Sequence, residues 1–386
     1  MEKRAIRVTA WRSIAACFLA VSISWSACPG VTLAAGESED VNVVEDINSV
    51  AYWWQWTGAE ANDPDLTGIL YWTDKDSGLI QRRFLAGGPA MTLLTRDQGL
   101  QQPYGLAIDR LRNRLYWADT GAICSARLDG TDIQVLVTGL TFPADLALHA
   151  AAGRLYWTDQ TAGLIQRLDL EPGTVETILA DLSQPYYLAL DIRDGMIYWT
   201  EFKNSVIRRA RWDGTDSQIV VRGLKRARDI AVDPVARNLY WADRDAAKIQ
   251  RMGLDSQGPP EDLLTGADGL MRPHGLVLDL FARRIYWTDT DTPGVYCGSM
   301  EGGDMRALAT EGLDGPWGLG LITATGDFDM DADVDPFDLR AFLQPWLDDE
   351  VSWTTGWCAG RDLNADGVVN LKDFSKLAQS WTHQIE

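Results

Sequence analysis

Histidine is scarce in this chain of 386 residues. The sequence contains three, His149, His274 and His383. No Ser-His-Asp or Cys-His arrangement can be placed among them, and such arrangements activate the nucleophile in many hydrolases. The shortage therefore argues against hydrolysis by an activated serine or cysteine.

Cysteine is also sparse, with five in the whole chain. Cys17 and Cys28 lie in the predicted leader, which leaves Cys124, Cys297 and Cys358. The remainder is odd in number, and Cys124 and Cys297 occur in matching stretches of two different repeats. No disulfide framework can be read from this pattern, so we expect free thiols in strands or loops.

Basic residues are outnumbered, with 35 Lys and Arg against 55 Asp and Glu. Without residues 1–35 the chain would carry 31 basic and 54 acidic residues, a net charge of −23. Nucleic acids and anionic membrane surfaces require a basic face on their partner. Neither is expected here, whereas an acidic surface suits a soluble secreted protein or one that gathers cations.

The first 35 residues have the layout of a secretory signal peptide. Residues 1–12 are basic, residues 13–27 are mostly apolar, and residues 32–34 are small enough to lie near a cleavage point. The uncharged run over 13–36 spans 24 residues, which is also long enough for a retained membrane anchor. In either case the body of the protein is expected to be secreted or at the cell surface.

A short aromatic run organises the rest of the chain. Leu-Tyr-Trp-Thr-Asp at residues 155–159 occurs in six copies with small edits, and each copy has high strand propensity. The tryptophans of the copies follow one another at spacings of 45, 40, 42, 42 and 46 residues. A period in this range indicates a stacked or radial repeat architecture.

Each repeat contains four short apolar runs. A run that starts with proline or alanine precedes most aromatic runs, as at residues 103–109. Two further runs follow, as at residues 126–130 and 133–137, and the first of these ends in Asp-Gly, a strong hairpin-turn signal. Four short antiparallel strands make one blade of a β-propeller.

The count of runs indicates how the ring closes. The first aromatic run, at residues 70–74, has no proline-led run before it, and the last proline-led run, at residues 316–322, has no aromatic run after it. Pairing these two runs completes a blade and leaves no exposed sheet edge. We therefore predict a mainly β fold, a six-bladed propeller over residues 67–322 that is closed by its N- and C-terminal strands.

The aromatic pairs are expected to form the core. Because a blade lies between two neighbours, Tyr116 would face one neighbour and Trp117 the other. Each ring can bury ~150–250 Å², which corresponds to about 4–6 kcal/mol at ~25 cal/mol per Å², as an upper bound. The Asp or Glu that ends each copy is expected to accept backbone hydrogen bonds at the strand end.

These runs closely resemble the YWTD propeller, the class B repeat of the low-density lipoprotein receptor. The resemblance implies a six-bladed ring that binds protein or peptide ligands, usually on one face. Ala118 and Ala242 depart from the pattern by replacing the motif threonine. The cysteine-rich modules that adjoin the receptor repeats are absent, so a receptor role does not carry over.

At two sets of equivalent positions the residue type varies strongly between repeats. Positions that serve only for packing should carry similar residues in every repeat. The variable positions follow the first residue of each proline- or alanine-led run and would lie at one level around the axis. We interpret seven of them as a recognition surface at the mouth of the ring: Tyr104, Asp145, Tyr186, Arg228, Asp229, His274 and Trp317. The alternative is that they only fill the channel mouth. A catalytic metal on the axis could draw only on Asp145, Asp229 and His274.

The composition changes after residue 322. A linker at 323–326 precedes a segment, 327–386, with two acidic loops that match a twelve-residue calcium-loop template. The predicted Ca²⁺ ligands of the first loop are Asp327, Asp329, Asp331, Asp333, Asp335 and Asp338. Those of the second are Asp362, Asn364, Asp366, Val368, Asn370 and Asp373. The second loop fits better, because Gly367 permits its sharp turn where the first loop has Ala332.

Each loop runs into an apolar-patterned segment, which predicts a small all-α calcium-binding domain. Tandem loops with Asp at position 12, each followed by one helix, resemble a type I dockerin of the secreted bacterial type. The resemblance implies Ca²⁺-dependent folding and docking to a cohesin-like protein. Partner-reading positions in that family are here Pro336-Phe337 and Leu371-Lys372, which differ from the common Ser-Thr pair.

These predictions lead to two alternative hypotheses about function. The favoured one is a secreted, non-catalytic binding protein whose propeller recognises a protein, peptide or glycan and whose calcium domain docks to a partner. The alternative is a propeller enzyme or an accessory component of extracellular polysaccharide degradation. Residues 36–66, which include four closely spaced tryptophans and tyrosines at 52–56, are expected to pack on the propeller.

Overall fold

The structure is a computed structural model, and it describes residues 68–85, 87–256 and 258–323. Several predictions fall outside these ranges. They are the signal peptide, the segment at 36–66, the linker from residue 324 onward, and the C-terminal domain with both calcium loops.

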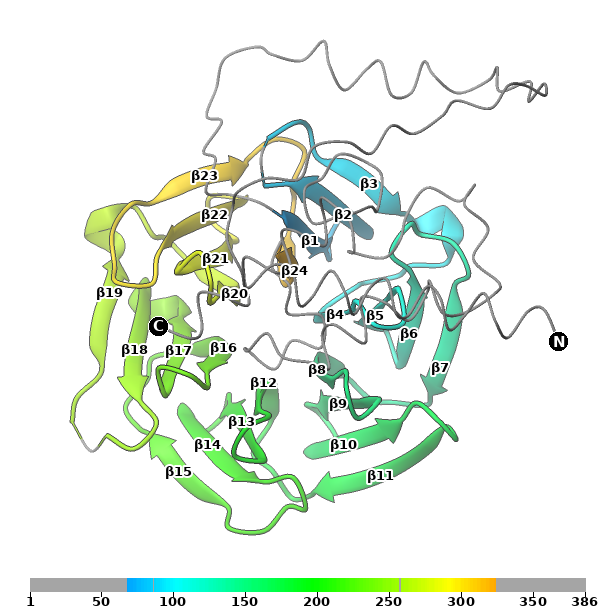
Figure 1. Cartoon of the computed structure of the whole chain (residues 1–386), viewed down its shortest axis with the longest axis horizontal. Helices are drawn as coiled ribbons and strands as arrows, with labels where there is room; N and C mark the ends of the chain where they lie inside the picture. The colour runs from blue at the N-terminus through cyan, green and yellow to red at the C-terminus, as the bar shows by residue number, and fades with distance from the viewer. Residues whose placement is uncertain (1–67, 86, 257, 324–386) are drawn as a thin grey trace, which may run out of the picture. The chain divides into compact units, whose positions relative to one another are not determined.

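The described residues form six four-stranded antiparallel sheets around a central axis (Figure 1). From the innermost strand outward, blade 1 contains β24 (Pro316–Thr323), β1 (Gly68–Asp74), β2 (Leu79–Phe84) and β3 (Met91–Leu94). Blade 2 contains β4 (Leu106–Asp109), β5 (Arg114–Asp119), β6 (Ala122–Arg127) and β7 (Gln134–Thr138). Blade 3 contains β8 (Pro143–His149), β9 (Arg154–Asp159), β10 (Leu164–Asp169) and β11 (Thr174–Leu179).

The other three blades repeat this order. Blade 4 contains β12 (Pro185–Asp191), β13 (Met196–Glu201), β14 (Val206–Arg211) and β15 (Gln218–Val221). Blade 5 contains β16 (Ala227–Asp233), β17 (Asn238–Asp243), β18 (Lys248–Gly253) and β19 (Glu261–Thr265). Blade 6 contains β20 (Pro273–Asp279), β21 (Arg284–Asp289), β22 (Gly294–Ser299) and β23 (Arg306–Ala309). Three 3-10 turns lie in the connections: η1 (Arg96–Gln98), η2 (Arg244–Ala246) and η3 (Gly266–Asp268).

The ring closes as predicted, with the last strand beside the first. β24 pairs antiparallel with β1, and Ile69 stands opposite Ile322 in the register. The Asp74 carboxylate accepts the backbone N–H groups of Asp314 and Gly315, at 2.8 and 3.1 Å. Two ends of the domain more than 240 residues apart are therefore joined by a ladder and by a buried acid.

The motif tryptophans are the largest buried side chains, and each is at most 1% exposed. Tyr116 packs with Leu146 and Trp157 of blade 3, whereas Trp117 packs with Tyr71 and other residues of blade 1. The predicted division of each aromatic pair between two neighbouring blades is thus confirmed. It explains why the aromatic strands show no alternation of apolar and polar residues.

The motif acids hold the loops at the strand ends, with one exception. The five aspartates accept backbone N–H groups from the segment that leads into the inner strand of their own blade, as Asp159 does from Thr141 and Phe142 at 2.7 and 2.9 Å. Glu201 was predicted to behave alike, and for Glu201 the prediction is wrong. Within the described ranges its carboxylate has no backbone donor and accepts instead from the Asn204 side-chain amide at 2.7 Å. In this blade the N–H of Gln184, which is equivalent to Phe142, donates instead to the carbonyl of Leu182 at 3.1 Å.

Both cysteines of the described residues are buried, and neither forms a disulfide. Cys124 lies on β6 of blade 2 and Cys297 on β22 of blade 6. Burial raises the pKa of the Cys124 thiol to about 12. It therefore packs as an inert apolar side chain.

Candidate functional site

Side chains at the start of the inner strands meet at one end of the ring. We call this group the mouth cluster, and it consists of Tyr104, Tyr186, Tyr187, Arg228, His274 and Trp317. Aromatic contacts run through it from blade to blade. The ring centroids of Trp317 and His274 are 3.7 Å apart, and those of Trp317 and Tyr104 are 5.8 Å apart. The structure thus brings together the five predicted mouth residues other than the two aspartates.

The motif threonines hold the backbone of this cluster. The hydroxyls of Thr73, Thr158 and Thr288 donate to the carbonyl oxygens of Tyr104, Tyr186 and Trp317, respectively, at 2.6, 2.6 and 2.9 Å. In each case the threonine belongs to one blade and the acceptor to the next. The repeated motif therefore fixes not only the core but also the position of three aromatic residues of the mouth.

The pattern changes in blade 2, where Ala118 replaces the motif threonine. Ala118 has no hydroxyl, and the N–H of Gly105 donates directly to the carbonyl of Ala144 at 3.1 Å. The two blades approach so closely that a Cβ on Gly105 would lie 2.1 Å from an Asp145 side-chain oxygen. Only glycine fits at this position, because any side chain would collide with the neighbouring strand.

Arg228 lies under the aromatic side chains of the mouth and is 6% exposed. The carbon of its guanidinium is 4.7 Å from the ring centroid of Tyr186, 5.5 Å from that of Phe202 and 5.9 Å from that of Trp317. Its Nε and Nη1 atoms are buried and have no hydrogen-bond partner among the described residues. Attraction between the cation and the ring faces replaces part of the lost hydration.

Tyr187 and His274 form a buried hydrogen-bonded pair. The Tyr187 hydroxyl lies 2.7 Å from His274 Nδ1, and the two side chains come from blades 4 and 6. Burial, reinforced by the Arg228 charge, lowers the pKa of His274 well below its usual range. Burial also raises the pKa of Tyr187 well above its usual range. Both groups are therefore neutral near pH 7, and this contact orients side chains rather than storing a proton.

The two remaining predicted residues, Asp145 and Asp229, form what we call the acid pair. Asp145 accepts the backbone N–H of Leu188 in blade 4 at 3.0 Å. Asp229 accepts the N–H groups of Ile230 and of Leu276 in blade 6, both at 2.8 Å. Each acid thus ties its blade to the next, as the motif threonines do elsewhere.

Burial dominates the electrostatics of the acid pair. It raises the pKa of Asp145 to about 7, although the Leu188 N–H partly opposes the shift. It also raises the pKa of Asp229 well above its usual range, and the charge of Asp145 adds to that rise. Within the described ranges no His, Cys, Asp and Glu side chains gather in groups of three or more that could hold a metal.

A basic rim surrounds the mouth cluster. It consists of Lys75, Arg226, Arg244 and Arg272, and each of these cations has a carboxylate neighbour. Arg226 and Arg244 lie 3.2 and 3.8 Å from Asp245. Arg272 lies 3.1 Å from Asp291, and Lys75 pairs with Asp76. Because Arg226 and Arg244 share Asp245, three carboxylates offset the four cations of the rim.

Two aromatic residues at the mouth, Phe142 and Phe202, were not predicted from the sequence. Phe142 packs at a tilt against Tyr104, with 5.0 Å between ring centroids, and the ring centroids of Phe202 and Tyr186 are 6.2 Å apart. Phe142 immediately precedes the proline that starts β8, and Phe202 immediately follows the motif acid of β13. Comparing these two further repeat positions across the blades would have revealed them, because they vary as the predicted positions do.

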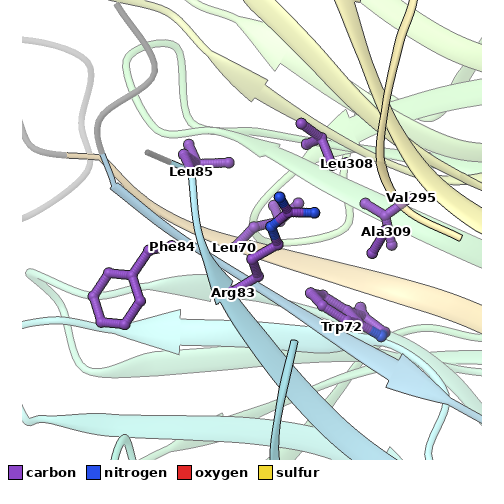
Figure 2. A pocket seen from close by; sticks show the side chains of 8 residues that line it. All are labelled: Leu70, Trp72, Arg83, Phe84, Leu85, Val295, Leu308 and Ala309. Carbon is purple, nitrogen blue, oxygen red and sulfur yellow. The ribbon is translucent and has the colours of Figure 1, made fainter. Parts of the chain in front are cut away.

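A separate apolar cavity lies at the seam between blades 1 and 6 (Figure 2). It is lined by Leu70, Trp72, Arg83, Phe84, Leu85, Val295, Leu308 and Ala309. Its volume of about 10 Å³ is room for about one water molecule. It is a packing defect of the closing seam and not a ligand pocket.

The comparisons with known proteins agree with this architecture. Residues 195–234 match the low-density lipoprotein receptor repeat class B. The chain is 39% identical over 77 residues to Protein cueball of Drosophila grimshawi and 44% identical over 71 residues to Nidogen-2 of Mus musculus. Each match covers 18% of this chain, but only 12% of the first relative and 5% of the second.

A solved structure extends the comparison to the whole ring. A chain of the crystal structure of a nidogen/laminin complex aligns with a TM-score of 0.59 and 20% identity, over 66% of this chain and 98% of its own length. At that identity the likeness shows the fold. Within the described residues no helix is long and apolar enough to cross a membrane. Residues 195–234 therefore match one low-density lipoprotein receptor class B repeat, and the described part of the chain is a six-bladed propeller with a YWTD-type motif in each blade.

Proposed function

We propose that this propeller is a non-catalytic module that binds a protein or peptide at its mouth. The observation that carries the proposal is the mouth cluster itself. Burial between blades accounts for the repeated Tyr-Trp pairs, but it does not account for different aromatic side chains at equivalent positions. Trp317, Phe142 and Phe202 are only partly buried, which leaves aromatic surface at the mouth for a partner to cover.

The relatives support a protein partner. Nidogen, whose complex with laminin provides the similar fold, binds a protein. The neutral Tyr187–His274 pair, with both groups unsuited to proton transfer near pH 7, favours binding over acid–base catalysis.

For the rest of the chain we propose secretion through the leader, and Ca²⁺-dependent docking of residues 327–386 to a cohesin-like protein. The spacing of the two acidic loops supports the calcium-binding part of this proposal. The net charge of −20 is compatible with a soluble extracellular protein.

A pair of variants of the full chain tests the propeller proposal. Trp317→Ala removes aromatic surface at the mouth, whereas Phe281→Ala removes an exposed ring beyond Asp279, at the opposite end of an inner strand. Proteins retained from the extracellular fraction of the source culture by wild-type protein should be lost with Trp317→Ala and kept with Phe281→Ala. Equal retention by both variants, or conversion of the retained molecule by the wild type, would contradict the proposal.

A further inference from the structure

Arg228 differs from every other cation at the mouth. Lys75, Arg226, Arg244 and Arg272 each have a carboxylate within ion-pairing distance. Within the described ranges Arg228 has none, although it is the most buried of the five. A buried guanidinium with two nitrogens lacking partners is costly, and such groups are normally paired with an acid or with several acceptors. The fold therefore holds a charge that nothing within the described ring neutralises.

The surroundings of Arg228 fit an anion with an apolar neighbour. Tyr186, Phe202 and Trp317 present ring faces around the guanidinium within 6 Å of its carbon. These rings exclude water, so a hydrogen bond between Arg228 and an anion is stronger there than at the open surface. They offer aromatic surface and few hydrogen-bonding groups, which suits a peptide side chain better than the hydroxyls of a sugar.

The electrostatic potential at the mouth also favours an anionic ligand. The positive charge of Arg228 contributes to lowering the pKa values of both His274 and Arg244, after burial. The acid pair beneath them does not carry two full charges at neutral pH, because burial raises both of its pKa values. A chain with a net charge of −20 thus places an uncompensated cation at one end of its ring.

We propose that Arg228 is the receptor for a carboxylate of the partner protein, supplied by an Asp or Glu side chain in a segment whose neighbouring apolar residue packs on Trp317 and Phe202. This inference rests on the proposed binding function and names the chemistry of the ligand. Arginine suits the role because its planar fork can donate two parallel hydrogen bonds to one carboxylate.

The experiment uses the immobilised full chain and a library of N-acetylated, C-amidated hexapeptides in which each position is varied in turn. Blocked ends ensure that only side chains supply carboxylates. Peptides retained by the wild type should prefer Asp or Glu at one position. Replacing that acid with Asn or Gln should weaken binding about tenfold, because one charge-assisted hydrogen bond is worth about that factor.

Two variants connect the preference to Arg228. Arg228→Gln should abolish the discrimination between acid and amide peptides, and Arg222→Gln should retain it, because Arg222 is exposed on the loop after β15. The acid-to-amide comparison on wild-type protein stands even if Arg228→Gln does not fold. A uronic acid oligomer serves as a second probe.

The outcomes separate this inference from the proposed function. Peptides that bind, are lost with Trp317→Ala, and show no preference for acids would overturn the carboxylate assignment and leave the binding function in place. Binding of the uronic acid oligomer through Arg228, with no peptide retained, would assign the site to a glycan and overturn the peptide partner. Loss of the acid preference in Arg228→Gln alone supports the proposal.

Discussion

The buried acid Asp145 makes the stability of the ring depend on pH. Asp145 is 5% exposed, and its carboxylate accepts one N–H from the neighbouring blade. Within the described ranges no cation lies within ion-pairing distance of it. We predict that Asp145→Asn, which keeps an oxygen for the Leu188 N–H but cannot ionise, removes the part of this dependence that Asp145 contributes and leaves the part due to Asp229.

The sign and size follow from the pKa of Asp145, which burial raises from 3.8 to about 7. Between these values the folded protein holds a proton that the unfolded chain has released, so the free energy of unfolding falls as the pH rises. A shift of about 3 units corresponds to roughly 4 kcal/mol over the whole range, of which about 2–3 kcal/mol is lost between pH 5 and pH 8. Above pH 7 both states are ionised and the loss is complete.

The assay is urea-induced unfolding of the full chain at pH 5 and pH 8, followed by tryptophan fluorescence, which reports the six buried motif tryptophans. Wild type should lose more stability than Asp145→Asn between the two pH values, and the variant should be the more stable protein at pH 8. Asp97→Asn, a change at an exposed acid, is the control and should follow wild type. An equal loss in wild type and Asp145→Asn would refute the argument from burial.

Three further predictions concern closure, the metal and the mouth. Asp74→Ala removes the acceptor for Asp314 and Gly315 and should lower the free energy of unfolding by at least about 2 kcal/mol; a change below 0.5 kcal/mol, roughly the scatter of a surface substitution, would contradict this. Chelation of Ca²⁺ should remove helical circular dichroism from residues 327–386 and leave the thermal midpoint of the ring unchanged, so identical spectra with and without chelator would refute the calcium domain. Arg228→Met should stabilise the unliganded ring by about 1 kcal/mol in urea unfolding, because it removes unpaired buried donors; destabilisation would instead indicate a structural role.

The fold could be predicted from the sequence because its signals repeat. A Tyr-Trp pair with both members apolar indicates a strand buried on both faces, and the spacing of 40 to 46 residues sets one such strand per blade. The closure of the ring followed from a missing strand at each end, and β24 does lie beside β1. Repetition makes such inferences robust, since an error in one copy is corrected by the other five.

The contacts of the mouth could not be predicted in the same way, because each occurs once. Tyr187 and His274 are 87 residues apart and meet across blades 4 and 6 through side-chain conformations that no local pattern encodes. The same holds for Arg228, since the lack of a carboxylate partner among the described residues is a property of the assembled ring. The predicted positions were brought together, but their burial and the neutral state of His274 depend on neighbours that lie on other strands.

The motif threonine explains how a regular ring carries an irregular mouth. In the three blades where its hydroxyl reaches the next blade, the carbonyl that it holds belongs to Tyr104, Tyr186 or Trp317. After Ala242 the corresponding residue is His274, which is held instead by the Tyr187 hydroxyl. At Tyr104, Tyr186 and Trp317 the motif hydroxyl fixes the backbone, so the side chains there can differ between blades without loss of packing. Variation at these three positions is therefore free to serve recognition, whereas Arg228 follows Thr200, whose hydroxyl accepts the Tyr187 N–H of its own blade.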